Sequence, residues 1–159
     1  MSKSETTVRP AEPGDLPGVK AVLRDTFETT WRPHLTPQAA RNYIETDRGS
    51  RYAEAHCGEF WVADVHGEIG GLVHWRGDFI ESLHVSSRFQ GMGIGKALLA
   101  LAEREIRKAG FPRARLETDT FNERAMAVYL ALGYVERGRY PDTEWESGFT
   151  TVLYEKRLG

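Results

Sequence analysis

The spacing of apolar residues alternates between two periods along the chain, and these periods predict the elements of the fold. Three-and-four spacing, typical of amphipathic helices, runs from Leu16 to Phe27, resumes briefly at 38–44, and returns from Ile94 until Gly110. Runs rich in β-branched and aromatic residues between glycine-containing turns indicate strands. In chain order we expect strand 6–10, helices 16–27 and 38–44, strands 60–65, 69–75 and 79–85, a helix from 94 to about 110, strand 114–118, a helix from 120 to 133, and strands 134–140 and 149–158.

Capping residues and prolines define several of these boundaries. Proline interrupts the first helix within the aromatic segment 31–37, where Thr36 is the expected cap of the second helix and Pro37 its first-turn residue. Thr120 and Glu123 form a capping-box pattern for the last helix. We therefore expect two N-terminal helices joined by an aromatic elbow.

This order predicts an α/β (α+β) protein with a mixed, mostly antiparallel sheet of about seven strands and about four helices. The three strands between 60 and 85 form an antiparallel meander. Strand 114–118 must run parallel to strand 79–85, because a crossover helix separates them. The length of 159 residues suits one domain, 1–159, with a substantial core.

Composition narrows the classes of partner. With 21 basic and 23 acidic residues the net charge is -2, so we expect neither nucleic acid nor a membrane surface as partner. No apolar run approaches the roughly 18 residues of a membrane span. The single cysteine, Cys57, and the polar start of the chain, without the apolar segment of a secretory signal, predict a cytoplasmic protein that binds a small molecule or peptide.

The segment 90–96 is the most informative motif. Gly91, Gly93 and Gly95 follow a predicted strand and open a predicted helix, an arrangement that brings backbone N–H groups and the positive end of the helix dipole to one point. The expected ligand is a phosphate or pyrophosphate, although the same glycines can serve only as a tight turn. The spacing matches neither G-x-G-x-x-G nor the P-loop pattern.

A second motif lies about thirty residues downstream of the glycine loop. The two motifs consist of Gln90, Gly93 and Gly95 in the first, and of Asn122, Ala125, Tyr129, Gly133 and Tyr134 in the second. Together they closely resemble the GCN5-related N-acetyltransferase (GNAT) family, over nearly the whole chain and most specifically from about Ile80 to Tyr134. The resemblance implies the acyl-CoA N-acyltransferase fold and acetyl-CoA as acetyl donor, with no metal.

The resemblance also assigns the cofactor contacts. Backbone groups of the glycine loop bind the pyrophosphate, while the preceding strand offers main-chain groups to the pantetheine arm and, through a bulge within 83–85, an N–H to the thioester oxygen. Asn122 is a further polar contact, and Gly91 stands where many relatives carry a basic side chain. The implied cofactor residues are Leu83, His84, Val85, Arg88, Gln90, Gly91, Met92, Gly93, Ile94, Gly95, Lys96, Asn122 and Tyr129.

Acetyl transfer requires an acid for the departing thiolate and a route for the amine proton. Tyr129 matches the family's general acid, with an unperturbed pKa near ~10. Two carboxylates are candidate bases: Glu81 is expected to share a strand face with Leu83, and Glu117 resembles the base of ribosomal-protein N-terminal acetyltransferases. We prefer Glu81, because Glu117 can equally point outward, and an already neutral amine needs only water. His84 faces the other way and is expected to pack.

Aromatic residues are the candidates for the acceptor pocket: Trp31, His34, Trp75 and Trp145. The preferred acceptor is a primary amine of a small molecule, attacked directly in a ternary complex. The alternatives are a peptide or protein N-terminal or lysine acetyltransferase, an acetyl-CoA sensor, and a nucleotide-binding protein, which lacks the expected metal-binding carboxylates. A homodimer through the last strands is a further expectation that no residue pattern demonstrates.

Overall fold

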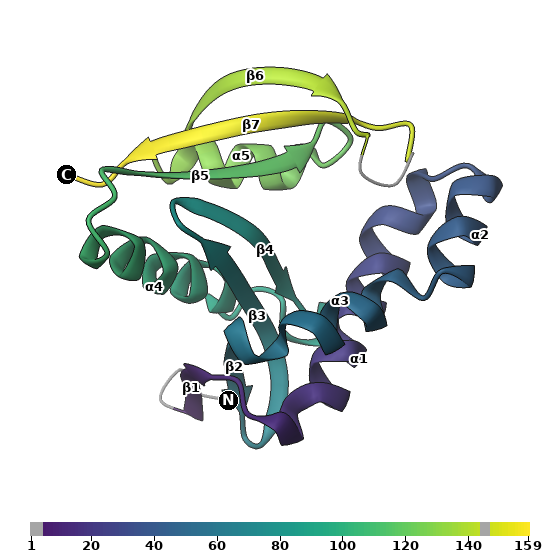
Figure 1. Ribbon diagram of the computed structural model, residues 1–159, viewed down its shortest axis with the longest axis horizontal. Coiled ribbons are helices and arrows are strands. Elements are labelled where there is room, and N and C mark those ends of the chain that lie inside the picture. Colours follow the sequence, from purple (N-terminus) through teal and green to yellow (C-terminus); the bar gives the residue numbers. More distant parts are fainter. Residues whose placement is uncertain (1–4, 144–146) are drawn as a thin grey trace.

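The computed structural model describes residues 5–143 and 147–159, which contain one seven-stranded sheet in the order β1-β2-β3-β4-β5-β7-β6 (Figure 1). All strands pair antiparallel except β4 and β5, which run parallel as predicted. The strands are β1 (Thr6–Pro10), β2 (Trp61–Val65), β3 (Glu68–Arg76), β4 (Phe79–Val85), β5 (Arg113–Asp119), β6 (Val135–Pro141) and β7 (Thr150–Arg157).

Five α-helices occur in the described residues, one more than the sequence pattern predicts. They are α1 (Leu16–Thr26), α2 (Pro37–Glu45), α3 (Arg48–His56), α4 (Ile94–Lys108) and α5 (Glu123–Ala131). The additional helix is α3, which contains Gly49 and buries only Ala53 completely, so its apolar periodicity is weak. No described helix has the length and apolarity needed to cross a bilayer.

The helix boundaries agree with the capping and proline signals except at the start of α5. Thr36 caps α2 by accepting a hydrogen bond from the N–H of Ala39 at 3.1 Å, as predicted. The first helix is interrupted within 31–37, as predicted, because Leu35 and Thr36 are extended; α1 reaches this break through a π-helical turn at 27–31 and a 3₁₀ turn at 32–34. The cap of α5 is Asn122, whose side chain accepts from the N–H of Ala125 at 3.1 Å, and not Thr120.

Helices cover both faces of the β1–β4 half of the sheet. In Figure 1, α4 lies on one side of β2–β4 and α1 and α3 lie on the other. Consecutive residues of β3 point to the two cores: Leu72 packs with Val19 and Leu23 of α1, whereas Val73 packs with Leu98 of α4. The core beneath α4 also includes side chains from β5 and β7, so it spans both halves of the sheet.

The ladder between β4 and β5 is short, and the two strands part after it. Only two residue pairs join them, Phe79 with Arg115 and Ile80 with Leu116. The closed end is held by Asp78, whose carboxylate accepts from the Arg115 guanidinium at 2.8 Å and from that of Arg113 at 3.3 Å. Beyond Ile80 the edge of β4 that faces β5 is open, and its backbone groups border a cleft.

A β-bulge interrupts β4 at the same point. Ile80 pairs with Trp75 and Ser82 with His74, so Glu81 has no partner on β3. The predicted bulge therefore exists, but it lies at Glu81 and not within 83–85. A bulge places two consecutive side chains on one face of the strand. It accounts for the spacing of three between Ile80 and Leu83, both of which pack on the α4 side.

Glycines in β3 let α4 approach the sheet closely. A Cβ atom added to Gly71 would lie 2.8 Å from the carbonyl oxygen of His84 and 3.0 Å from the Ile94 side chain. The neighbouring backbone cannot give way as a flexible side chain would. This close approach positions the first turn of α4, and with it the glycine loop, against the open end of β4.

We predict that Gly71→Ala lowers the free energy of unfolding by about 1–3 kcal/mol, the typical effect of overpacking. Chemical denaturation monitored by circular dichroism measures the change. The matched control is Gly138→Ala in β6, where an added Cβ meets no atom within 4 Å. Equal stabilities of the two variants would show that the close contact of α4 with β3 is unimportant.

Candidate active site

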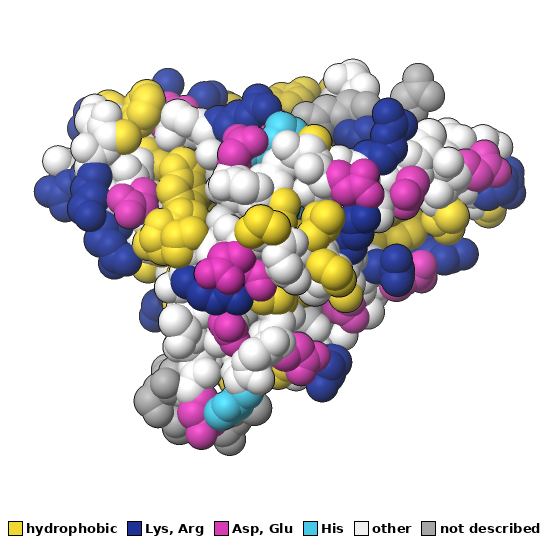
Figure 2. Space-filling model, turned by 60° about the horizontal axis from the view of Figure 1, so that its bottom comes forward, with side chains coloured by type: hydrophobic (Ala, Val, Ile, Leu, Met, Phe, Trp, Pro, Cys, Tyr) yellow, Lys and Arg dark blue, Asp and Glu magenta, His cyan; other side chains and the backbone are white. Residues whose placement is uncertain are grey.

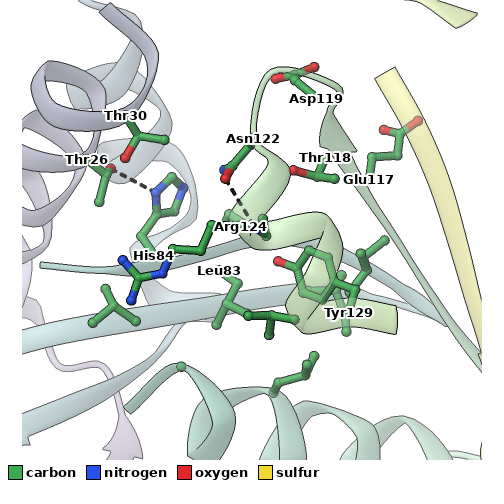
Figure 3. Close-up of a pocket in the computed structure, with 18 of the residues that line it drawn as sticks. Thr26, Thr30, Leu83, His84, Glu117, Thr118, Asp119, Asn122, Arg124 and Tyr129 are labelled. Atoms are coloured by element: carbon green, nitrogen blue, oxygen red, sulfur yellow. Dashed lines mark hydrogen bonds between the residues drawn. The ribbon is translucent and has the colours of Figure 1, made fainter. Parts of the chain in front are cut away.

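A cleft of about 740 Å³ opens where β4 and β5 part. One wall is β4 with the loop 90–96 and the start of α4, and the other is the end of β5 with α5 (Figure 3). Most of the predicted site residues line it: Trp31, Glu81, Leu83, His84, Val85, Gln90, Gly91, Gly93, Ile94, Gly95, Lys96, Glu117, Asn122 and Tyr129.

The glycine loop has the geometry of an anion site. Gly91 and Gly93 adopt left-handed backbone conformations, with φ of 80° and 79°, and Gly93 is the N-cap of α4. The Gln90 side chain donates to the carbonyl of Val85 at 3.1 Å and so ties the loop to the end of β4. The loop N–H groups and the α4 dipole therefore meet at the cleft, where they can bind a pyrophosphate.

Two loop residues predicted to contact the cofactor are outside the cleft lining. Arg88 is exposed and pairs with Glu68. Met92 packs against the core beneath α4. Of the predicted side-chain cations, only Lys96 lines the cleft.

Tyr129 of α5 points its hydroxyl into the cavity in Figure 3. Its ring also packs near Tyr134 and Tyr154, with both ring centroids 5.9 Å away, so core packing and cleft lining coexist. Burial raises the pKa of the Tyr129 phenol to about 12. The group thus remains a neutral hydrogen-bond donor throughout the neutral pH range.

The two candidate bases occupy opposite walls. Glu81 is exposed at the cleft, but the bulge removes it from the face of Leu83, so the expected shared face is wrong. Its charge acts instead on Tyr52 and His74, on the α3 side of the sheet. Glu117 is half-buried in the cleft wall, beyond the last β4–β5 pair, and accepts a hydrogen bond from Tyr140.

His84 combines a packing contact with a place in the lining. Its Nδ1 lies 2.9 Å from the hydroxyl oxygen of Thr26, and its ring lies 5.5 Å from that of Trp31. The Thr26 hydroxyl also donates to the Leu23 carbonyl at 3.2 Å, so His84 Nδ1–H is the donor to Thr26. Burial lowers the pKa of the His84 imidazole to about 4, which keeps the ring neutral.

Of the aromatic residues predicted to line the acceptor pocket, some lie in the cleft and others do not. Trp31 lines the cleft and donates its indole N–H to Asp119 at 3.3 Å. His34 packs on Phe121 outside the lining, with ring centroids 4.4 Å apart, and Trp75 packs against the core beneath α4. The position of Trp145 lies outside the described residues.

Several charged lining residues were not predicted. Asp119 and Asp142 join Glu117 on the β5 and β6 wall, and Arg124 stands in the first turn of α5. A basic residue in the first turn of a helix is unfavourable beside the positive end of the helix dipole, and this position was the sequence signal that could have marked Arg124 as a functional residue. The outer face in Figure 2 mixes basic and acidic side chains, whereas this wall collects three carboxylates.

Comparison with known proteins identifies the family. The profile of the family described as "Acetyltransferase (GNAT) family" matches residues 19–134. The chain belongs to this family. Both resembling motifs and most of the cleft lining fall within the matched range.

Individual relatives support this family membership. The chain is 34% identical over 140 residues to "Probable N-acetyltransferase family 8 member 5" of Mus musculus, covering 76% of this chain and 61% of that protein. It covers 55% of the length of N-acetyltransferase 8B of the same species, so it spans little more than half of such relatives.

Two solved GNAT structures share the fold. A GCN5-related N-acetyltransferase from Rhodopseudomonas palustris superposes with a TM-score of 0.83 at 19% identity, covering 99% of this chain and 98% of that one. The PaiA N-acetyltransferase of Thermoplasma acidophilum, solved in complex with coenzyme A, gives a TM-score of 0.77 at 18% identity, with 96% and 98% covered.

The lowered pKa of His84 predicts a specific pH dependence of stability. In the unfolded GNAT chain the imidazole titrates near ~6.5, so below that pH the unfolded state binds a proton that the native state rejects. Stability attributable to His84 is therefore complete above pH 6.5 and is lost as pH falls toward 4, by up to about 3 kcal/mol.

Denaturation at several pH values measures this loss. In His84→Gln the fall in stability between pH 6.5 and 4 should be smaller than in the wild type, whereas the non-titrating cleft variant Thr30→Val should keep the wild-type slope. Equal slopes in wild type and His84→Gln would contradict the assigned pKa.

Proposed function

We propose that the chain transfers the acetyl group of acetyl-CoA to a primary amine by direct attack in a ternary complex. The observation that carries this proposal is the coincidence of two features. The glycine loop and the parted strands β4 and β5 open into the same cleft, so an anion site and an open strand edge face one ligand. The coenzyme A bound to the PaiA structure, which shares this fold, supports the choice of cofactor.

In the proposed complex the pyrophosphate binds at 91–96 and the pantetheine arm follows the open edge of β4. Backbone N–H groups of that edge near the Glu81 bulge polarise the thioester carbonyl. Tyr129 donates a hydrogen bond to the departing thiolate, and its raised pKa ensures that the donor is protonated. Arg124 and Lys96 supply positive charge to the cofactor side of the cleft.

The acceptor side favours a cationic amine. Glu117, Asp119 and Asp142 gather on one wall, with Trp31 beside them. Carboxylates attract an ammonium ion, and an aromatic ring adds a favourable cation contact. We propose a small-molecule amine; a peptide N-terminus or lysine carries the same charge and is the second candidate.

Release of thiol from acetyl-CoA tests the proposal, with polyamines, amino acids, aminoglycosides and short peptides as acceptors. Turnover with small cationic amines supports it, and turnover confined to peptides favours the second candidate. Tight binding of acetyl-CoA without turnover on any amine would replace transfer with acetyl-CoA sensing.

Tyr129→Phe should lower kcat by about 100-fold, the typical loss when one hydrogen bond to a developing negative charge is removed, with little change in the KM for acetyl-CoA. Steady-state thiol release measures both constants. The control is Tyr43→Phe, since Tyr43 of α2 stacks on Phe27 and lies outside the cleft lining. A kcat of Tyr129→Phe within twofold of the control would remove the phenol from the mechanism.

Glu81→Gln should lower the acetylation rate most at low pH, where the acceptor arrives as an ammonium ion and must lose a proton to a carboxylate. Raising the pH neutralises the amine and should restore the rate, while the affinity for acetyl-CoA stays unchanged. Glu117→Gln is the paired variant. If the rate of Glu117→Gln falls in this way and that of Glu81→Gln does not, Glu117 and not Glu81 is the base. If the pH profiles of both variants match the wild type, water accepts the amine proton.

A further inference from the structure

A continuous chain of hydrogen bonds runs from the cleft along the α3 face of the sheet to the surface. Ser82 belongs to the cleft lining, and its hydroxyl lies 2.7 Å from the Tyr52 hydroxyl, which lies 2.6 Å from Nδ1 of His74. Nε2 of His74 lies 3.1 Å from the Glu59 carboxylate, whose other oxygen lies 2.9 Å from Nδ1 of His56. We call Ser82, Tyr52, His74 and Glu59 the relay.

The chemistry of these groups fixes the direction of every proton in the relay. An ionised Glu59 only accepts, so Nε2 of His74 carries the proton of the neutral ring and Nδ1 is a bare acceptor. Tyr52 must then donate to His74, and its oxygen accepts from Ser82. All three donors point away from the cleft, which leaves the Ser82 oxygen able to accept a proton there.

An ammonium acceptor loses two protons on its way to becoming an amide. The first leaves before attack, and Glu81 with solvent serves that step in the proposed function. The second leaves the nitrogen as its bond to the acetyl carbon forms. A positive charge would otherwise remain on the product nitrogen, so this proton also needs an acceptor.

We propose that His74 is the acceptor of this second proton, reached through Ser82 and Tyr52. The inference rests on the proposed function. As the amine N–H bond breaks, its proton binds Ser82 Oγ, the Ser82 proton moves to Tyr52, and the Tyr52 proton binds His74 Nδ1. The Nε2–H bond to Glu59 stays intact and stabilises the imidazolium, as the aspartate of a Ser-His-Asp triad does. Thiolate and imidazolium are later neutralised by proton exchange with water when the cleft empties.

The surroundings of His74 suit a transient proton acceptor. Its side chain is 1% exposed, packs on the Phe60 ring and has a pKa held below the usual range by burial, so the ring is neutral before attack. Glu59 and Glu81 act in the opposite direction, and His56 adds to the lowering. Burial raises the pKa of Tyr52 to about 12, so Tyr52 passes protons on without resting as a phenolate.

Steady-state thiol release from pH 5.5 to 9.5 tests the relay in the full chain. Tyr52→Phe removes the central hydroxyl and keeps the ring that packs on Phe60. Its kcat should fall about 100-fold at every pH, including high pH, with the KM for acetyl-CoA unchanged. Glu81→Gln, by contrast, recovers at high pH, because a neutral amine has already lost its first proton.

Ser82→Ala interrupts the relay at the cleft and should give the same dependence of kcat on pH as Tyr52→Phe. Either variant alone can therefore test the relay if the other folds poorly. Glu59→Gln removes the negative charge beside His74, so the acid limb of kcat should move to lower pH. Tyr43→Phe is the matched control. Wild-type rates in both Tyr52→Phe and Ser82→Ala at all pH values would overturn the relay.

The protonation state of His74 gives a readout independent of turnover. ¹⁵N NMR of the imidazole should show the proton on Nε2 in the wild type, and a proton on Nδ1 would overturn the relay. Absence of turnover with every amine would instead overturn the proposed function, so the two failures are distinguishable.

Discussion

The parting of β4 and β5 is the constraint on which the site depends. Parallel strands normally continue their ladder, but here it ends after Ile80 and Leu116, with Asp78 clamping the closed end through Arg113 and Arg115. The bulge at Glu81 turns β4 away at that point. Open backbone edges are costly unless water or a ligand satisfies them, so this one is a natural place for a ligand.

The helices hold the parted strands in place. On one side, the glycines of β3 admit α4 so closely that its first turn and the loop 90–96 meet the end of β4. On the other, α1 continues through a π-helical turn that brings Thr30 and Trp31 to the cleft. Departures from regular helices often occur at functional sites, and this one faces the proposed acceptor side.

Burial sets the protonation states that the proposed chemistry uses. Tyr129 and Tyr52 are kept as neutral phenols, while His84 and His74 are kept as neutral imidazoles. Charged side chains also line the cleft: Glu117, Asp119 and Asp142 at the ends of β5 and β6, and Lys96 in the first turn of α4. In the proposed complex these carboxylates face the amine, and Lys96 lies beside the cofactor pyrophosphate.

Local sequence patterns predicted the elements that form through interactions between residues close in the sequence. The strands, α4, the cap at Thr36 and the glycine loop follow from periodicity and turn chemistry, and all are present. The sequence did not predict α3, because its weak apolar face is stabilised by packing on α1. The face of Glu81 was wrong because a bulge depends on pairing with β3, which the β4 sequence alone does not encode.

Contacts between side chains distant in the sequence were the other feature that the sequence did not predict. Asp119 and Asp142 reach the cleft through the β5–β7–β6 arrangement, and the relay joins α3 to β3 and β4. Trp75 was predicted to bind substrate but lies outside the cleft lining and packs against the core beneath α4, since a strand aromatic can face either way. Such placements follow from tertiary packing.

A ¹H–¹⁵N NMR titration of the protein with acetyl-CoA shows whether the glycine loop and the open edge of β4 bind the cofactor. We expect saturable shifts that are largest at the backbone amides of Gly91, Gly93 and Gly95 and extend to the open edge of β4. Binding that leaves these amides unmoved and shifts another surface would contradict it.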